Sequence, residues 1–595
     1  MKRLGLAAVI AALMATAACT GSSDAADNPG NCTVVNTVVS SEKVELLTAL
    51  AKGFNGSKAA AINGGCAFVR VSKKASGSAT QLLAGDWPDP DANGPQPAIW
   101  SPASSAWISI LNQSRAQNNA PVMTGPATSF MNTPLVIAMP RKMAEALGWP
   151  NTPIGYADIV ALAKDPQGWA AKGHPEWGQF KLGKTNPNYS TSGLHFTIAE
   201  YYAATNKTKG LSLEDLKDPA VSQYARDVES SVVHYGDITM TFLNNWFRND
   251  ARGTALQYVS AVGVEEKSVI DYNRGNPDGI LDPGEKPRPP REPLVAIYPK
   301  EGTLFSDNPL MVVNAPWVSA KAKEGAQKFI DFVRQPDNQR KVLEYGFRPG
   351  NPSVSLAAPI AQQNGVDPNQ PQNLLELPTP PVLTGVLEQW AQVRKSARVL
   401  MVIDVSGSMG DSASDSSTET KLDLAKRAAI NSLGQFADTD QVGLRIFSTG
   451  ISRNEPTDYL DVVPVAAMSQ NREVLRRRID DLVPTRGTPL YTVTGDSFRT
   501  MERQYDPQAI NAIVLLTDGR NEDPRNSDLN KLVATLRADS EGESQKPVRI
   551  FTIGYGQDAN ATELREISDA TNAAYYSASN PTTIDAVFQS VVSNF

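Results

Sequence analysis

Residues 398–408 read RVLMVIDVSGS, an apolar run that ends in Asp404 and is followed by Ser406 and Ser408. The near-continuous apolar residues predict a strand that is covered on both faces of a parallel sheet. A carboxylate at the exit of a buried strand destabilises the fold unless it is paired or bound to a cation. The end of this strand is therefore a candidate site.

Two later segments place polar side chains in a similar way. The apolar run 513–517 ends at Asp518, and Thr488 lies in a Gly-Thr-Pro segment between the two strands. Further apolar strands are predicted at 441–449 and 548–556, with helices between them. Such alternation implies a parallel sheet, in which ligands bind beyond the carboxyl ends of the strands.

The elements Asp-x-Ser-x-Ser, Gly-Thr-Pro and Thr-Asp-Gly, in this order on this strand pattern, resemble the von Willebrand factor type A domain. The resemblance implies a Rossmann-like, doubly wound α/β domain at 396–595 with a metal-ion-dependent adhesion site. It implies that Mg²⁺, or Mn²⁺ or Ca²⁺ in its place, is held by the matching residues Asp404, Ser406, Ser408, Thr488 and Asp518.

The resemblance also implies how this site binds a partner. The three hydroxyls hold the cation directly, the two aspartates act largely through water, and one position stays open for an acidic residue of a protein partner. Magnesium suits such a site because it prefers oxygen ligands and keeps several waters. The alternative is that Asp404, Thr488 and Asp518 only cap helices.

A proline-rich hinge at 377–381 and a predicted linker helix at 386–395 separate this domain from an α/β module at 33–385. Three predicted strands of that module each end in a cluster of small hydroxyl residues where a helix begins. Helix N-termini offer free N–H groups and a positive dipole end, which suit an anion.

This arrangement resembles bacterial extracellular solute-binding proteins, most closely the oxyanion and molybdate type of the two-lobed, type 2 periplasmic-binding-protein-like fold. The resemblance implies a solute cleft lined by Ser40, Ser41, Ser76, Ser78, Ser101, Ser104, Ser190, Thr191 and Ser192. The alternative is that each hydroxyl only caps a helix, as Ser and Thr commonly do. Basic residues are scarce in these loops apart from Lys73 and Lys74. A neutral or weakly charged solute, or no ligand at all, is therefore an alternative to an oxyanion in this cleft.

Residues 271–285 contain a partial match to a calcium-binding loop. Asp278, Asp282 and Glu285 occupy ligand positions of an EF-hand. The first ligand position is Arg274, which cannot bind calcium. A polar, turn-rich insertion is the favoured interpretation of this segment, with a Ca²⁺ site as the alternative.

The N-terminus predicts export. Residues 1–18 combine a basic start with an apolar run too short to span a bilayer, and Cys19 follows small residues. This resembles a bacterial lipoprotein signal, which implies that Cys19 is acylated and that 19–32 is a flexible tether. An ordinary signal peptide is the alternative. In an oxidising compartment Cys32 and Cys66 are expected to form a disulfide. The alternative is that they are two buried free thiols.

Composition excludes several classes of function. The chain has 56 basic and 63 acidic residues, a net charge of −7, so a nucleic-acid partner is not expected. Only three histidines and three cysteines occur, which leaves almost no ligands for zinc. No nucleophile–base pair, Walker-type phosphate loop or pair of catalytic acids is visible, so we do not expect an enzyme.

We therefore expect a lipid-anchored binding protein on the outer face of the cell membrane. Its A-domain would bind an acidic protein partner through the metal, and its first module would bind a small solute. Two alternatives stay open. One is the substrate-binding component of an ABC-type importer with an accessory A-domain, and the other is a metal-chelatase-like accessory subunit.

Overall fold

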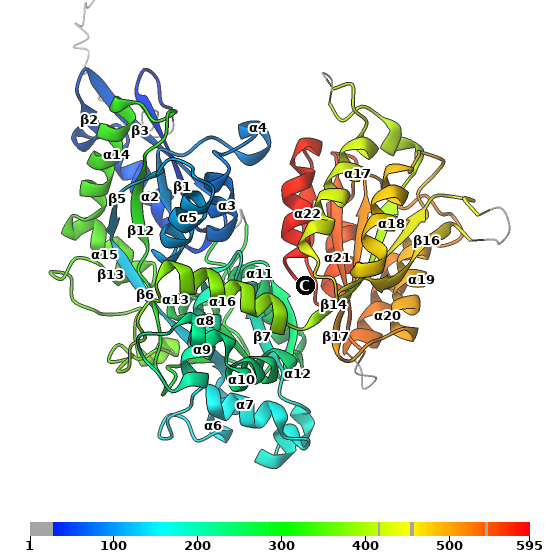
Figure 1. Cartoon of the computed structure of the whole chain (residues 1–595), viewed down its shortest axis with the longest axis horizontal. Coiled ribbons are helices and arrows are strands. Elements are labelled where there is room, and N and C mark those ends of the chain that lie inside the picture. Colours follow the sequence, from blue (N-terminus) through cyan, green and yellow to red (C-terminus); the bar gives the residue numbers. More distant parts are fainter. Residues whose placement is uncertain (1–27, 282–283, 415–416, 453–456, 542–545) are drawn as a thin grey trace, which may run out of the picture.

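The computed structural model describes residues 28–281, 284–414, 417–452, 457–541 and 546–595. Two sheets form the N-terminal module and a third forms the C-terminal module, so the predicted α/β class and two-module arrangement are confirmed (Figure 1). The signal peptide, Cys19 and most of the tether lie outside the described residues. Within the described residues, no helix has both the length and the apolar character needed to cross a membrane.

The first lobe is built on a six-stranded sheet. In spatial order its strands are β2 (Ala61–Ile62), β3 (Gly65–Lys73), β1 (Thr33–Val39), β4 (Ile99–Ser101), β12 (Pro309–Val313) and β5 (Thr124–Ser129). Strand β1 pairs in parallel with both β3 and β4, so their carboxyl ends share one edge. The helices of this lobe are α2 (Val44–Phe54), α3 (Ser76–Ala84), α4 (Pro90–Asn93), α5 (Ala106–Gln117), α14 (Ala320–Val333) and α15 (Pro336–Glu344).

The second lobe is built on a sheet around the long strand β6 (Met131–Pro140). Its other strands are β10 (Leu294–Ile297), β9 (Ala261–Glu265), β7 (Leu182–Thr185), β8 (Val232–Gly236), β11 (Phe305–Ser306) and β13 (Arg348–Pro349). Its helices are α6 (Arg141–Ala146), α7 (Tyr156–Lys164), α8 (Thr191–Thr205), α9 (Leu213–Lys217), α10 (Pro219–Ser230), α11 (Thr239–Arg252), α12 (Ala255–Tyr258) and α13 (Glu266–Asn273).

The C-terminal module has one six-stranded sheet. Its order is β16 (Tyr459–Ala467), β15 (Gln441–Phe447), β14 (Ser396–Asp404), β17 (Ala509–Thr517), β18 (Val548–Tyr555) and β19 (Tyr575–Ala578), with only β16 antiparallel. The helices are α17 (Lys421–Ser432), α18 (Met468–Asp480), α19 (Leu490–Arg503), α20 (Leu529–Glu541), α21 (Ala561–Ala570) and α22 (Ile584–Val592).

The apolar run of β14 explains why helices cover both faces of this sheet. Alternate side chains of a strand point to opposite faces. Val399 and Met401 belong to the core under α17, α18 and α22, whereas Leu400 and Val402 belong to the core under α19, α20 and α21. All four side chains are almost completely buried, as predicted for a parallel strand covered on both sides.

The helix between the modules differs from the predicted linker. It is α16 (Pro380–Val393), which begins six residues before 386 and packs against α5 of the first lobe and α8, α9 and α10 of the second. Its buried residues Val382, Val386, Trp390 and Val393 follow the spacing of one helix face. The edge of the Trp390 ring meets Tyr235 with the ring centroids 5.3 Å apart. The helix is thus part of the packed body of the first module.

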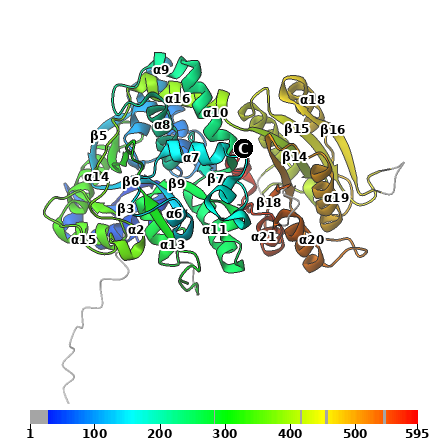
Figure 2. The same ribbon diagram turned by 90° about the horizontal axis from the view of Figure 1, so that it is seen from below.

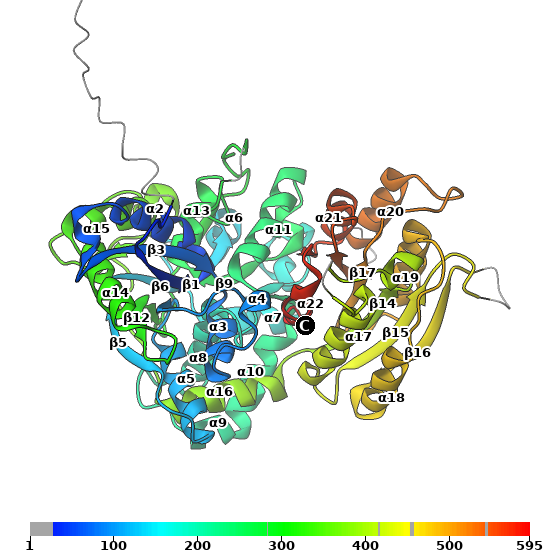
Figure 3. The same ribbon diagram turned by 90° about the horizontal axis from the view of Figure 1, so that it is seen from above.

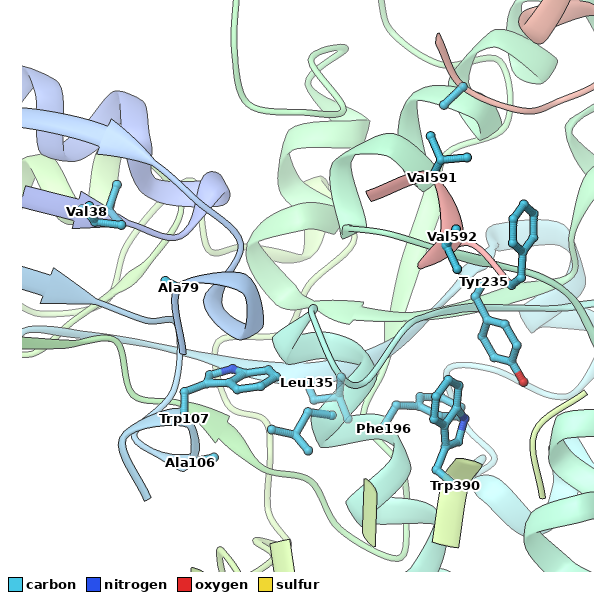
Figure 4. Close-up of a cluster of buried hydrophobic side chains, with 14 of the residues drawn as sticks. Val38, Ala79, Ala106, Trp107, Leu135, Phe196, Tyr235, Trp390, Val591 and Val592 are labelled. Carbon is cyan, nitrogen blue, oxygen red and sulfur yellow. The ribbon is translucent and has the colours of Figure 1, made fainter. Parts of the chain in front are cut away.

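The two modules share one hydrophobic core. Figure 4 shows side chains of both lobes, α16 and α22 in the same cluster, including Trp107, Tyr235, Trp390 and Val592. Figure 3 shows α22 and α21 on the side of the C-terminal module that faces the first module, and Figure 2 shows α21 on the same side. Across this contact, Arg248 forms a 2.9 Å ion pair with Asp569. The second lobe and the C-terminal helices therefore pack directly on each other.

The expected disulfide is confirmed. Cys32 and Cys66 are bonded and are 34 positions apart in the sequence. The bond ties the residue before β1 to the neighbouring strand β3 of the first sheet.

Candidate metal centre and inter-lobe cleft

The carboxylate of Asp404 lies at the end of β14, beside the end of β17. Its Oδ1 accepts a hydrogen bond from the Ser406 N–H at 2.7 Å, and its Oδ2 accepts one from the Thr517 hydroxyl at 2.5 Å. The side chain is fully buried. Burial raises the pKa of Asp404 to about 7, and the nearby Asp518 carboxylate raises it further against the lowering effect of these hydrogen bonds. No cation in the described residues pairs with this carboxylate.

The two serines join Asp404 to Asp518. The hydroxyl oxygens of Ser406 and Ser408 are 3.1 Å apart, and the Ser408 hydroxyl donates to Asp518 Oδ1 at 2.8 Å. The second carboxylate oxygen of Asp518 accepts a 2.8 Å hydrogen bond from Lys421, the first residue of α17. The chain turns sharply after β14 because residues 407–410 form a short 3-10 helix.

Thr488 lies in the loop before α19, and this loop is held against the same strand ends. The Gly407 N–H donates to Arg486 O at 2.6 Å, and the Thr485 N–H donates to Val405 O at 2.7 Å. A Cβ atom placed on Gly519 would lie only 3.2 Å from the Thr488 hydroxyl oxygen. Thr488 therefore lies beside Asp518 and Gly519. The structure brings all five predicted metal ligands to one end of the sheet.

The donor set fits a hard divalent cation. It consists of oxygen atoms only, from two buried carboxylates and three hydroxyls, and the one ammonium group of Lys421 leaves a net negative charge. Mg²⁺ prefers such ligands. Within the described ranges, no group of three or more His, Cys, Asp and Glu side chains could hold a metal ion, so this hydroxyl-rich centre is the candidate.

Three residues at this centre were not predicted. Thr517 and Lys421 hold the two carboxylates, and Glu522 Oε2 accepts a 3.1 Å hydrogen bond from the Thr488 N–H. Thr517 directly precedes the predicted ligand Asp518, and Glu522 follows it by four positions. Their nearness to Asp518 in the sequence could have marked both as members of this centre. Nothing in the sequence around Lys421 indicates that the start of its helix folds over the end of another strand.

The two lobes close over the predicted cleft and leave a cavity of about 20 Å³ between them. This is roughly the space of one water molecule. Five predicted hydroxyl residues line it: Ser40, Ser41, Ser76, Ser190 and Thr191. Ser78 lines the adjoining cavity instead. Ser41 lines both cavities, so the predicted cluster of hydroxyls at the strand ends lies where the lobes meet.

The other three predicted hydroxyls do not line the cleft. Ser101 donates to Pro309 O at 2.8 Å, Ser104 lies 3.0 Å from the His195 ring, and Ser192 lies 2.7 Å from the Thr239 hydroxyl. Each of the three is buried and bonded to a neighbouring element. Their role in the structure is therefore to hold the lobes and helices together.

Two acidic residues of the cleft were not predicted from the sequence. Glu42 and Glu265 line the cavity, and among the described residues that line it none is basic. Burial, together with the Glu42 carboxylate, raises the pKa of Glu265 to about 8. Lys43 lies nearby but donates to Pro102 O and Asn308 Oδ1, both at 2.8 Å. This lining does not favour an oxyanion.

The adjoining cavity is larger, about 570 Å³, and the C-terminal module forms part of its wall. Ser41, Lys74 and Ser78 line it from the first lobe and Met240 from the second. Helix α22 contributes Ala586, Gln589 and Ser590. The last helix of the C-terminal module, α22, thus lies at the mouth of the cleft.

The segment 271–285 does not gather calcium ligands in its described part. Asp271 lies within α13 and pairs with Lys267, and Asn273 donates to Leu294 O at 2.7 Å. The Asp278 carboxylate accepts a 2.9 Å hydrogen bond from Asn244. Asp282 lies outside the described residues. Because α13 extends through residue 273, Asp271 and Asn273 are held by the helix and by β10 and cannot stand in for Arg274 as a first calcium ligand.

Comparison with protein families agrees with this geometry. Residues 35–348 match the model of bacterial extracellular solute-binding proteins, and residues 399–590 match the model of the von Willebrand factor type A domain. Two uncharacterized proteins of Mycobacterium tuberculosis, from strains CDC 1551 / Oshkosh and ATCC 25618 / H37Rv, are each 20% identical over 518 residues. That alignment covers 86% of this chain and 69% of each relative.

Solved structures similar to the chain include periplasmic binding proteins and a von Willebrand factor type A protein. The sulfate-binding protein SubI of M. tuberculosis H37Rv is 14% identical, with a TM-score of 0.34 over 54% of this chain and 88% of SubI. The periplasmic binding protein AfuA of Actinobacillus pleuropneumoniae is 14% identical, with a TM-score of 0.40 over 61% and 99%. A von Willebrand factor type A protein of Catenulispora acidiphila is 22% identical, with a TM-score of 0.28 over 33% and 42%.

Proposed function

Because the chain belongs to the bacterial extracellular solute-binding protein family and carries a segment that matches the von Willebrand factor type A domain, we propose that it is an exported binding protein. Its A-domain holds a divalent cation and binds an acidic protein partner through it. The observation that carries this proposal is the meeting of Asp404, Ser406, Ser408, Thr488 and Asp518 at one end of the sheet.

The residues of this centre have separate tasks in the proposal. Ser406, Ser408 and Thr488 offer neutral oxygens, so a bound cation keeps most of its positive charge. Asp404 and Asp518 balance part of that charge from a buried position. The cation, when bound, supplies an electrophilic position that a carboxylate of the partner completes. Both modules are of kinds that typically bind rather than catalyse, and no enzymatic step enters the proposal.

A pull-down tests the adhesion site. The mature chain immobilised in Mg²⁺ should retain a partner from membrane extracts and release it in EDTA. Asp404→Ala and Thr488→Ala should each lose this retention while their circular dichroism stays that of the wild type. Asp481→Ala removes an exposed aspartate of the same domain and should retain the partner. Equal retention in EDTA and Mg²⁺ would contradict the metal-dependent site.

The proposal places the protein at the outer face of the cell membrane through acylated Cys19. The lipoprotein-like signal and the extracellular character of the family support this location. Cys19→Ser should shift the protein from the membrane fraction to the soluble fraction. Retention of this variant in the membrane fraction would point to a different anchor.

We further propose that the first module binds a small neutral or cationic solute between its lobes, as the substrate-binding component of an importer would. Hydroxyls line the cleft together with Glu42 and Glu265 and without a basic side chain, which supports this solute class over an oxyanion. Thermal shifts should be measured with sugars, amino acids, diamines and sulfate. A shift with a sugar, amino acid or diamine that disappears in Ser76→Ala/Ser190→Ala supports the proposal, whereas a shift with sulfate alone contradicts it.

A further inference from the structure

Another cavity between the modules, of about 510 Å³, lies away from both sites described above. Its A-domain wall includes Ala509 and Arg549 at the starts of β17 and β18. The candidate metal centre lies at the opposite, carboxyl ends of the sheet. The second lobe contributes Lys181 and Tyr258, and Lys395 comes from the joint between the modules.

Three cations line this cavity without a carboxylate partner. Arg549 is only 4% exposed, and its Nη1 donates to Thr571 O at 3.2 Å and to Asn572 O at 3.0 Å. Lys181 donates to Gln257 O at 2.7 Å and Lys395 donates to Val232 O at 3.2 Å. All of these acceptors are main-chain carbonyls. No ion pair involves these three cations in the part of the chain that the structure describes.

The surroundings that the structure describes leave this positive charge unbalanced. Among the described lining residues, Glu176 is the one acidic residue, but it is 58% exposed and bonds to His174 at 3.1 Å. Burial lowers the pKa of Arg549, and burial and the charge of Arg549 together lower the pKa of Lys181. Burial also lowers the pKa of Lys395, although Asp506 acts in the opposite direction. Arg549 is buried, whereas Lys181 and Lys395 are half-buried. A buried cation without a counterion destabilises a fold.

We propose that this cavity binds a small polyanion, whose clustered phosphate or carboxylate oxygens accept hydrogen bonds from Lys181, Lys395 and Arg549. The volume falls in the range of pockets for small metabolites. Because the three cations come from the second lobe, the joint and the A-domain, the bound anion bridges the modules. It stabilises their docking by balancing charge that the protein alone leaves unpaired.

Titration calorimetry on the mature chain tests this site, with pyrophosphate and citrate as probes in separate arms at constant ionic strength. Pyrophosphate alone would identify a phosphate site and citrate alone a carboxylate site. One equivalent of at least one probe should bind. Lys181→Gln/Lys395→Gln should weaken that binding by about tenfold or more, because charged hydrogen-bond donors are lost.

The matched control is Lys321→Gln/Lys328→Gln, which removes two exposed lysines of α14 and should leave the affinity unchanged. If the cavity double variant fails to fold by circular dichroism, Lys181→Gln alone replaces it. Absence of binding by both probes would overturn the proposal. Equal affinity in the wild type and the cavity variant would also overturn it, because the anion would then be bound elsewhere.

Discussion

The ammonium group of Lys421 lies 2.8 Å from Oδ2 of Asp518, and both side chains are nearly inaccessible to solvent. Asp518 is a candidate metal ligand, so this lysine balances in the protein the same carboxylate that a cation would use. The main-chain oxygen of Lys421 also accepts a 2.9 Å hydrogen bond from Tyr555, which fixes the start of α17 over the strand ends. A bound cation and Lys421 therefore act on one carboxylate.

We predict that Lys421→Gln changes metal affinity and stability in opposite directions. In EDTA the melting temperature should fall, because loss of one partner of a buried ion pair destabilises by about 3 kcal/mol. The Mg²⁺ affinity should rise by about tenfold, since one positive charge beside Asp518 is removed. Titration calorimetry and thermal melts measure both effects.

Lys426→Gln is the control for this prediction, because Lys426 lies on the same helix and donates to Leu482 O at 3.4 Å. It should change neither quantity substantially. Weaker Mg²⁺ binding in Lys421→Gln would show that Lys421 organises the site rather than opposing the cation.

Removal of the Cys32–Cys66 bond should destabilise the first lobe. The bond closes a loop with a separation of 34 positions, and in the chain-entropy model such a crosslink contributes about 3–4 kcal/mol. Cys32→Ser/Cys66→Ser should therefore unfold at a lower urea concentration, while Mg²⁺ affinity stays unchanged because the A-domain is separate from this loop. An equal urea midpoint in the wild type and the double serine variant would contradict the prediction.

The five candidate metal ligands could be picked out together from the sequence because each lies directly at the end of an apolar strand or in a short motif beside one. Lys421 was not predicted, since its contact with Asp518 joins positions 97 residues apart. Such a contact depends on how α17 packs over the sheet, and the spacing of apolar residues along the sequence does not predict it.

The cleft shows more clearly that local sequence patterns do not predict contacts between distant segments. Ser76 and Ser104 both follow predicted strands, but only Ser76 lines the cavity, whereas Ser104 lies against His195. A local pattern cannot separate these outcomes, because the difference lies in how the second lobe closes on the first. Glu265 ends a short buried strand, and its place in the cleft follows from the same closure.

The buried carboxyl of Glu265 predicts a specific pH dependence. Its pKa is raised from 4.5 to about 8 by burial first and then by Glu42, against the lowering effects of Lys43 and Lys267. The folded chain therefore keeps a proton that the unfolded chain loses, and stability falls as pH rises through this window. Glu265→Gln stays neutral, so its stability relative to the wild type should increase by up to about 1.4 kcal/mol per pH unit between these values and level off above pH 8.

Urea midpoints at pH 5, 6.5 and 8 measure this difference. Glu145→Gln, at an exposed position, should show a difference from the wild type that does not depend on pH. A constant difference between Glu265→Gln and the wild type would mean that Glu265 is already ionised near its ordinary pKa in the folded protein.

The shared core predicts that the modules unfold together. The hydrophobic cluster that contains Tyr235 and Trp390 also contains Val592 of α22, and the Arg248–Asp569 ion pair at 2.9 Å lies at the same contact. Calorimetry of the wild type should therefore show one transition. Arg248→Ala/Asp569→Ala should lower its midpoint by an amount that corresponds to about 1 kcal/mol, since the pair is partly exposed.

The ion pair Arg499–Asp496 lies within α19 and is the control, because its loss should not affect docking. Small-angle X-ray scattering should show a larger radius of gyration only for the Arg248/Asp569 double variant if docking loosens. Two well-separated transitions in the wild type would contradict the prediction, because a core shared by both modules requires that neither unfold without exposing apolar surface of the other.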